Sequence, residues 1–150
     1  MKAHTLLLCA TLLLSAFANA SPYTPAPGSP ERIAIADAIR LAIIRDGAFA
    51  DDARHRRKFV IQTLNVEGRY AFFEGAGEEL ADGQYAYGPT AVIAFLENTA
   101  DGWVAFHLEC RGDVPSEAEV RQIRAEIPGD WPWDLFPAFW RHLLRTGSAT

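Results

Sequence analysis

Residues 59–74, FVIQTLNVEGRYAFFE, carry the pattern that decides the fold. Residues 59–66 are rich in β-branched and aromatic side chains, and a similar composition returns at residues 70–74. Glu67-Gly68 stands between the two runs and offers a tight turn. Two such runs on either side of a glycine turn are typical of a β-hairpin. This stretch therefore predicts two antiparallel strands.

A second hairpin is predicted further along the chain. Residues 91–96 and 103–110 are again strand-like, and Asp101-Gly102 lies in the turn between them. Together the two hairpins predict a four-stranded antiparallel meander. Strict alternation along the last strand would place Val104, Phe106, Leu108 and Cys110 on one face and Trp103, Ala105, His107 and Glu109 on the other.

A helix is predicted before the strands, over residues 30–45. Ser29 is a favourable N-cap, and Pro30 suits the first helical position. The apolar residues recur at helical spacing and form one face that can be buried. That face consists of Ile35, Ile39, Ala42 and Ile43.

The C-terminal third is predicted to be helical again. Ser116 and Glu119 have the spacing of a capping box, and Pro128-Gly129 should end the helix that they begin. Asp134 could cap a short last helix. The predicted fold class is therefore α+β, with an N-terminal helix packed on a four-stranded antiparallel meander and one or two C-terminal helices.

The N-terminus has the features of a secretory signal peptide. Lys2 precedes an apolar run over residues 6–17, and Ala18-Asn19-Ala20 is a small-x-small cleavage site. A retained membrane anchor needs about 20 apolar residues, and this apolar run is shorter. We therefore expect residues 1–20 to be removed, with no stable membrane insertion afterwards. We expect a periplasmic or secreted protein with a proline-rich tether over residues 21–29 and a single domain over 30–146.

Composition and cysteine content narrow the functional classes. The 150 residues carry a net charge of −5, which argues against nucleic acid as a partner because nucleic-acid binding needs a basic surface. Of the two cysteines, Cys9 would leave with the signal peptide, so Cys110 has no internal disulfide partner. On an apolar strand face, its thiol is expected to be a packing group.

A helix followed by a four-stranded meander, over residues 30–112, resembles the cystatin-like architecture. Residues 29–40, 59–60 and 66–72 also resemble small exported bacterial proteins of unassigned function, which implies the compartment. The cystatin inhibitory loop has a Gln-x-Val-x-Gly motif, and residues 62–66, QTLNV, lack its valine and its glycine. The resemblance therefore implies no inhibition of cysteine proteases. The related NTF2-like folds use strand residues for isomerase or hydratase chemistry.

His107 and Glu109 are the candidate catalytic residues. They project from the same face of one predicted strand, and this spacing could orient an imidazole for proton transfer. A strand face that is simply polar and exposed to solvent would place His107 and Glu109 at the same spacing without a catalytic role. The histidines of the mature chain, His55, His107 and His142, lack metal-ligand spacing, so we predict no metal. Gly75-Ala76-Gly77 has only the first two glycines of a dinucleotide-binding loop, with Leu80 at the third position, so we predict no cofactor.

Aromatic and basic clusters are the candidate binding residues. Aromatic side chains are enriched at interfaces, although packing over an open sheet face would also explain part of the C-terminal group. A short run of positive charge, residues 54–58, could meet an acidic partner. The candidates are Tyr85, Tyr87, Trp131, Trp133, Trp140, Arg56 and Arg57.

These patterns favour an exported, non-catalytic binding protein of the bacterial envelope. Its partner would be an envelope protein, a glycan or a second copy of the chain, giving a homodimer. One alternative is an NTF2-like small-molecule lyase or isomerase that uses His107 and Glu109. Another is an inhibitor or immunity protein of an envelope hydrolase.

Overall fold

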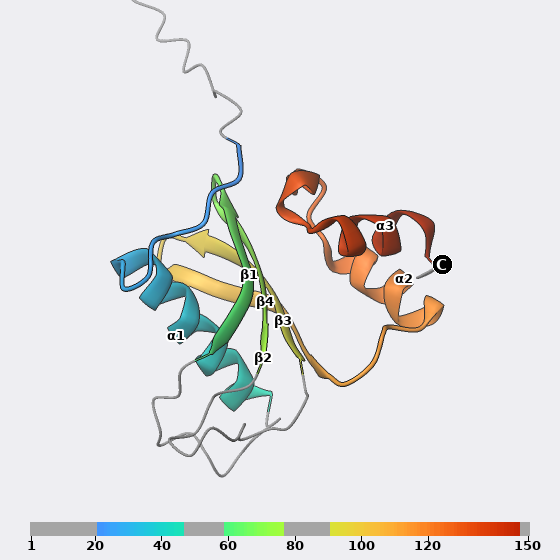
Figure 1. Cartoon of the computed structure of the whole chain (residues 1–150), viewed down its shortest axis with the longest axis horizontal. Helices are drawn as coiled ribbons and strands as arrows, with labels where there is room; N and C mark the ends of the chain where they lie inside the picture. Colours follow the sequence, from blue (N-terminus) through green and yellow to red (C-terminus); the bar gives the residue numbers. More distant parts are fainter. Residues whose placement is uncertain (1–20, 47–58, 77–90, 148–150) are drawn as a thin grey trace, which may run out of the picture.

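The computed structural model describes residues 21–46, 59–76 and 91–147, and it has the predicted α+β arrangement (Figure 1). In the described ranges, no helix is both long and apolar enough to cross a bilayer. The elements in chain order are α1 (Pro30–Arg45), β1 (Val60–Glu67), β2 (Tyr70–Ala76), β3 (Ala91–Thr99), β4 (Gly102–Arg111), α2 (Glu117–Glu126), the short 3-10 helix η1 (Trp133–Leu135) and α3 (Ala138–Thr146).

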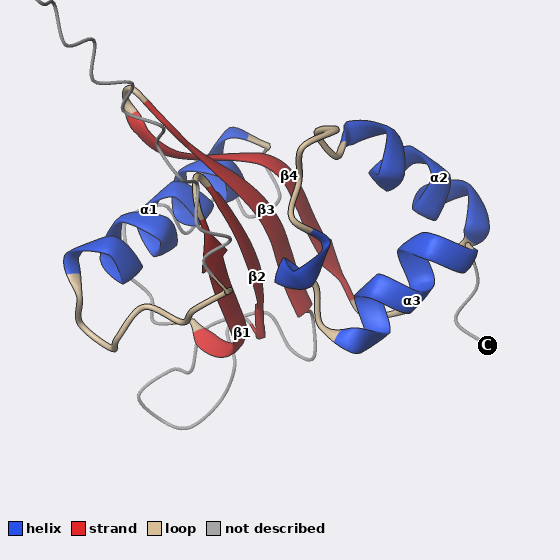
Figure 2. Cartoon of the chain, turned by 90° about the horizontal axis from the view of Figure 1, so that it is seen from above, coloured by secondary structure: helices blue, strands red, loops and turns tan. Residues whose placement is uncertain are grey.

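The four strands form one antiparallel sheet in the order β1-β2-β3-β4, which confirms the predicted meander. Helices cover both faces of this sheet. Figure 2 shows α1 on one face and α2 and α3 on the other, so the molecule has three layers. The described residues accordingly form two apolar cores, one on each side of the sheet.

The first core lies between α1 and the sheet, and its helical side is the predicted face of α1. Ser29 caps the helix as expected, since its side chain accepts a hydrogen bond from the backbone N–H of Arg32. The opposite face of α1 carries three exposed apolar side chains, Ile33, Leu41 and Ile44. The buried helical residues are Ile35, Ala38, Ile39, Ala42 and Ile43, and the sheet contributes Leu64, Val66, Ala71, Phe73, Val92, Ala94, Leu96 and Ala105.

The second core lies between the sheet and the C-terminal elements. The capping box that begins α2 is present, with Ser116 and Glu119 bonded to each other's backbone N–H groups. The prediction that Asp134 caps the last helix is wrong. That helix begins at Ala138 after Pro137, and the carboxylate of Asp134 instead pairs with Arg141 at 2.9 Å.

Strand β4 departs from the alternation that the sequence predicts. Its pairing with β3 shifts register where Phe95 faces His107 and Leu96 faces Ala105, which leaves Phe106 as the extra residue of a β-bulge. A bulge reverses the faces of the residues that follow it. Trp103, Ala105, Leu108 and Cys110 therefore pack in the first core, whereas Phe106 packs in the second.

The proline-rich segment 21–29, predicted to be a tether, forms hydrogen bonds with β1 and α1. The backbone of Tyr23 exchanges two hydrogen bonds with Val66 of β1, at 3.0 and 2.8 Å. The hydroxyl of Tyr23 also donates to Glu31, and Arg32 donates to the carbonyl of Pro25. Proline removes backbone donors but not carbonyl acceptors, so such a segment can still pair at a sheet edge.

Gly75 of β2 occupies a position with no room for a side chain. A Cβ placed there would come within 2.9 Å of both the Phe73 ring and the carbonyl oxygen of Val60. We expect Gly75→Ala to lower the free energy of unfolding by about 1 to 3 kcal/mol, because the neighbouring strand must move. Gly129→Ala is the matched control, since nothing lies within 4 Å of that Cβ. Urea denaturation checks this, and equal stabilities for the two variants would contradict it.

Candidate functional site

The C-terminal aromatic residues that were predicted to bind a partner mostly form the second core. Trp131 and Trp140 are 3% and 2% exposed, so they offer no surface to a partner. Trp133 is half-buried against the same core. Phe139 differs from them, with 47% of its surface exposed. The three tryptophans are buried or half-buried because the C-terminal elements cover the second face of the sheet.

The other predicted binding residues lie outside the described part of the chain. These are Tyr85, Tyr87, Arg56 and Arg57.

His107 lies between β4 and α2, and it is the one buried polar side chain of the described residues. Its ring lies against Phe95, with 4.7 Å between the ring centres. Nδ1 is 2.6 Å from Oε2 of Glu126, the last residue of α2. Nε2 is 3.5 Å from Oε1 of Glu109, close enough for attraction between charges but without a hydrogen bond. His107 thus links strand and helix.

The charged cluster continues from Glu109 along β4. Nε of Arg111 lies 2.9 Å from Oε2 of Glu109, although the two atoms are not aligned for a hydrogen bond. Nη2 of Arg111 donates to Oε1 of Glu119 at 2.8 Å. Glu119 in turn accepts from the backbone and the hydroxyl of Ser116. Two side chains of β4 are therefore each joined to α2 by carboxylates.

Contacts within this cluster shift the pKa of His107 and of Glu119. Burial alone would lower the pKa of His107, but Glu109 and Glu126 outweigh it, and the pKa is raised. Hydrogen bonds from Ser116 and from the Arg111 guanidinium lower the pKa of Glu119 to about 2. The contacts of His107 therefore favour its imidazolium form.

This arrangement suits a structural role for His107 better than proton transfer. The side chain is 8% exposed, and each ring nitrogen faces a carboxylate of the protein. A general base needs a nitrogen within hydrogen-bond reach of its substrate. Among the described residues, no group of three or more histidine, cysteine or acidic side chains is placed to hold a metal ion.

Cys110 follows on the opposite face of β4, partly buried against the first core. Burial raises the pKa of its thiol to about 11, with smaller contributions from Asp46 and Glu109. The thiol is therefore protonated at neutral pH, and a protonated thiol is a poor nucleophile.

A hollow of about 220 Å³ lies next to the charged cluster, and we call it the linker groove. It is bounded by the sheet, by α3 and by the segment 112–115 that leads from β4 to α2. Val114 and Phe139 are exposed for 51% and 47% of their surface. The lining residues are Glu74, Ala91, Ile93, Arg111, Gly112, Asp113, Val114, Pro115, Phe139 and Trp140.

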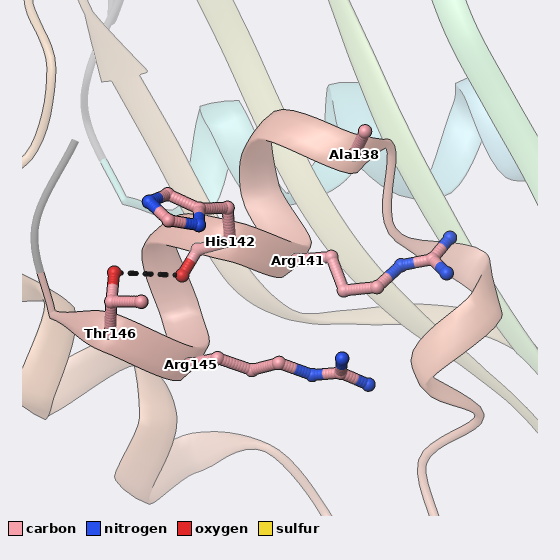
Figure 3. Close-up of a pocket in the computed structure, with 5 residues that line it drawn as sticks. All are labelled: Ala138, Arg141, His142, Arg145 and Thr146. Atoms are coloured by element: carbon pink, nitrogen blue, oxygen red, sulfur yellow. Dashed lines mark hydrogen bonds between the residues drawn. The ribbon is translucent and has the colours of Figure 1, made fainter. Parts of the chain in front are cut away.

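A second hollow, of about 340 Å³, lies on α3 itself and is shown in Figure 3. The side chains of Arg141 and Arg145 extend in the same direction, whereas His142 points away from them. Arg141 is already engaged by Asp134 and by the carbonyl of Phe136. Although this hollow is larger, the described residues that line it all belong to one helix. The linker groove is enclosed by three separate parts of the chain and is the better candidate site.

Sequence reasoning did not find the linker groove. Its residues come from β2, β3, β4, the following segment and α3, and no spacing along the chain connects them. The nearest sequence signal was the aromatic composition of the C-terminal segment, which also contains Phe139. The candidate residues His107 and Glu109 are not among the described lining residues of the groove. They are connected to it by Arg111, which lines the groove and pairs with Glu109.

No protein-family model, no curated protein and no solved structure matches this chain.

Proposed function

We propose that this chain is an exported, non-catalytic binding protein of the bacterial envelope, and that it holds its partner at the linker groove. The observation that carries the proposal is the combination of a walled hollow with exposed Phe139 and Val114 at its edge. Aromatic side chains beside a pocket are typical of residues that dominate binding energy.

The state of His107 supports a binding role over the NTF2-like lyase or isomerase. Nδ1 lies 2.6 Å from Glu126, and the side chain is only 8% exposed, so a substrate in solvent has little access to the ring. An inhibitor or immunity protein is one form of the proposed binding role, because such a protein also acts by occupying a partner's surface. The signal-like residues 1–20 support export.

Site-specific photocrosslinking in cells tests the binding role. A photoreactive phenylalanine analogue at Phe139 is expected to form a discrete adduct, whereas the same analogue at Leu41 is not. Leu41 is the matched control because it is 67% exposed and lies on α1, across the sheet from the groove. The adduct is identified by mass spectrometry, and the same analysis shows whether the mature chain begins at Ser21.

Binding is then measured with purified proteins. We expect Phe139→Ala to weaken the interaction by about tenfold or more, as truncation of a central aromatic residue does. Leu41→Ala should leave the dissociation constant within about twofold. Equal effects of the two substitutions, or adducts that form only from Leu41, would overturn the linker groove as the binding site.

A further inference from the structure

We infer that the linker groove accepts a single basic side chain, a lysine or an arginine, from a partner protein. This inference rests on the proposed function and adds the chemistry of the partner. It is carried by the charge of the groove, by the geometry of Glu74 and by the size of the hollow.

The polar groups of the groove have a net negative charge. Glu74 and Asp113 both line it. Among the described residues that line it, Arg111 is the only cationic one, and carboxylate oxygens of Glu109 and Glu119 lie 2.9 and 2.8 Å from its guanidinium. An anion that approached Arg111 would therefore meet two carboxylates already in place. A cation is favoured instead, as it is by the net charge of −5 for the whole chain.

Glu74 is held in a fixed position within the groove. Its Oε1 accepts a hydrogen bond of 3.2 Å from the indole Nε1 of buried Trp140. Its Oε2 receives no hydrogen bond from any of the described residues, and it is not among their buried polar atoms. This oxygen is therefore available to an ammonium or guanidinium group, and the indole keeps the carboxylate oriented for it.

The size of the groove suits one long side chain. Pockets for drug-sized molecules occupy about 300 to 1,000 Å³, whereas this hollow measures about 220 Å³. The apolar walls, which include Ile93 and Pro115, would contact the methylene stem of the side chain. The exposed ring of Phe139 would support the neighbouring backbone of the partner or attract the cation through its π-face.

Titration with blocked amino acids tests the charge preference directly. The probes are N-acetyl-lysine methylamide and N-acetyl-norleucine methylamide, which share the four-carbon stem and differ by the ammonium group. Amide signals of Gly112, Val114 and Phe139 report binding in two-dimensional NMR spectra of the full mature protein. We expect the lysine probe to bind about two- to fivefold more tightly than norleucine, as for a partly exposed ion pair. Added salt should reduce this preference.

Substitution of the carboxylate gives the second arm. Glu74→Gln should abolish the difference between the two probes while leaving norleucine binding unchanged. Asp101→Asn, an exposed acid in the β3–β4 turn, is the control and should preserve the difference. A probe preference that survives Glu74→Gln would overturn Glu74 as the group that binds the cation, and equal binding of lysine and norleucine to the wild type would overturn the basic side chain as ligand. A Phe139 adduct would still support the proposed binding role in that case. Failure of both probes together with absence of a Phe139 adduct would overturn the proposed function as well.

Discussion

Replacing Phe136 by alanine is expected to lower the free energy of unfolding by about 3 to 5 kcal/mol, the usual cost of deleting a fully buried aromatic ring. Phe136 is 1% exposed and lies at the centre of the second core. Its ring centre is 5.3 to 5.5 Å from those of Phe72, Phe95 and Trp131. These neighbours come from the sheet and from the C-terminal segment, so neither side can collapse easily into the space left behind.

Phe139→Ala provides the control for this measurement. The two residues are three positions apart, but Phe139 is 47% exposed and should cost less than about 1 kcal/mol. Urea denaturation followed by tryptophan fluorescence measures both variants. A similar loss for the two would mean that the C-terminal elements do not cover the sheet in solution.

The second large effect is expected from His107. At pH 6 we expect His107→Ala to lower the free energy of unfolding by about 2 kcal/mol. Removing its side chain leaves Glu109 and Glu126 without the imidazolium that each contacts in the wild type. This value is below that of a fully buried pair because the Glu126 side chain is 39% exposed.

The contribution of His107 should depend on pH in a defined direction. Because its pKa is higher in the folded than in the unfolded chain, the folded protein holds the proton more tightly. The stabilisation is complete below the pKa of an unfolded histidine, about 6.5, and is lost as the pH rises through the raised folded pKa. The wild type should therefore lose stability between about pH 6.5 and the raised pKa, relative to the alanine variant.

Two further substitutions separate this effect from a general disturbance of β4. Glu126→Gln should reduce the pH dependence, because it removes one of the two carboxylates that raise the pKa of His107. Glu117→Gln, at the exposed start of α2, should leave the dependence unchanged. Parallel pH profiles for wild type and His107→Ala would refute the raised pKa.

Much of the fold could be predicted because its signals are local. Ser29 and Ser116 cap helices through bonds within three residues, and Gly68 provides the positive φ of the β1–β2 turn. The candidate site could not be predicted in the same way. Glu74 and Trp140 are 66 positions apart, and their hydrogen bond exists only because α3 packs over β2.

The sequence by itself determined the order of helices and strands, the buried face of α1 and the meander, because capping, turn geometry and hydrophobic periodicity act over a few residues. Only the tertiary structure decided which aromatic residues are core, on which face of β4 each side chain lies, and where the linker groove is. The bulge at Phe106 arises from pairing with β3, and burial of Trp131 and Trp140 requires the sheet beneath them. Such properties depend on contacts between segments that are distant in sequence, and these contacts produce no regular spacing of residues along the chain.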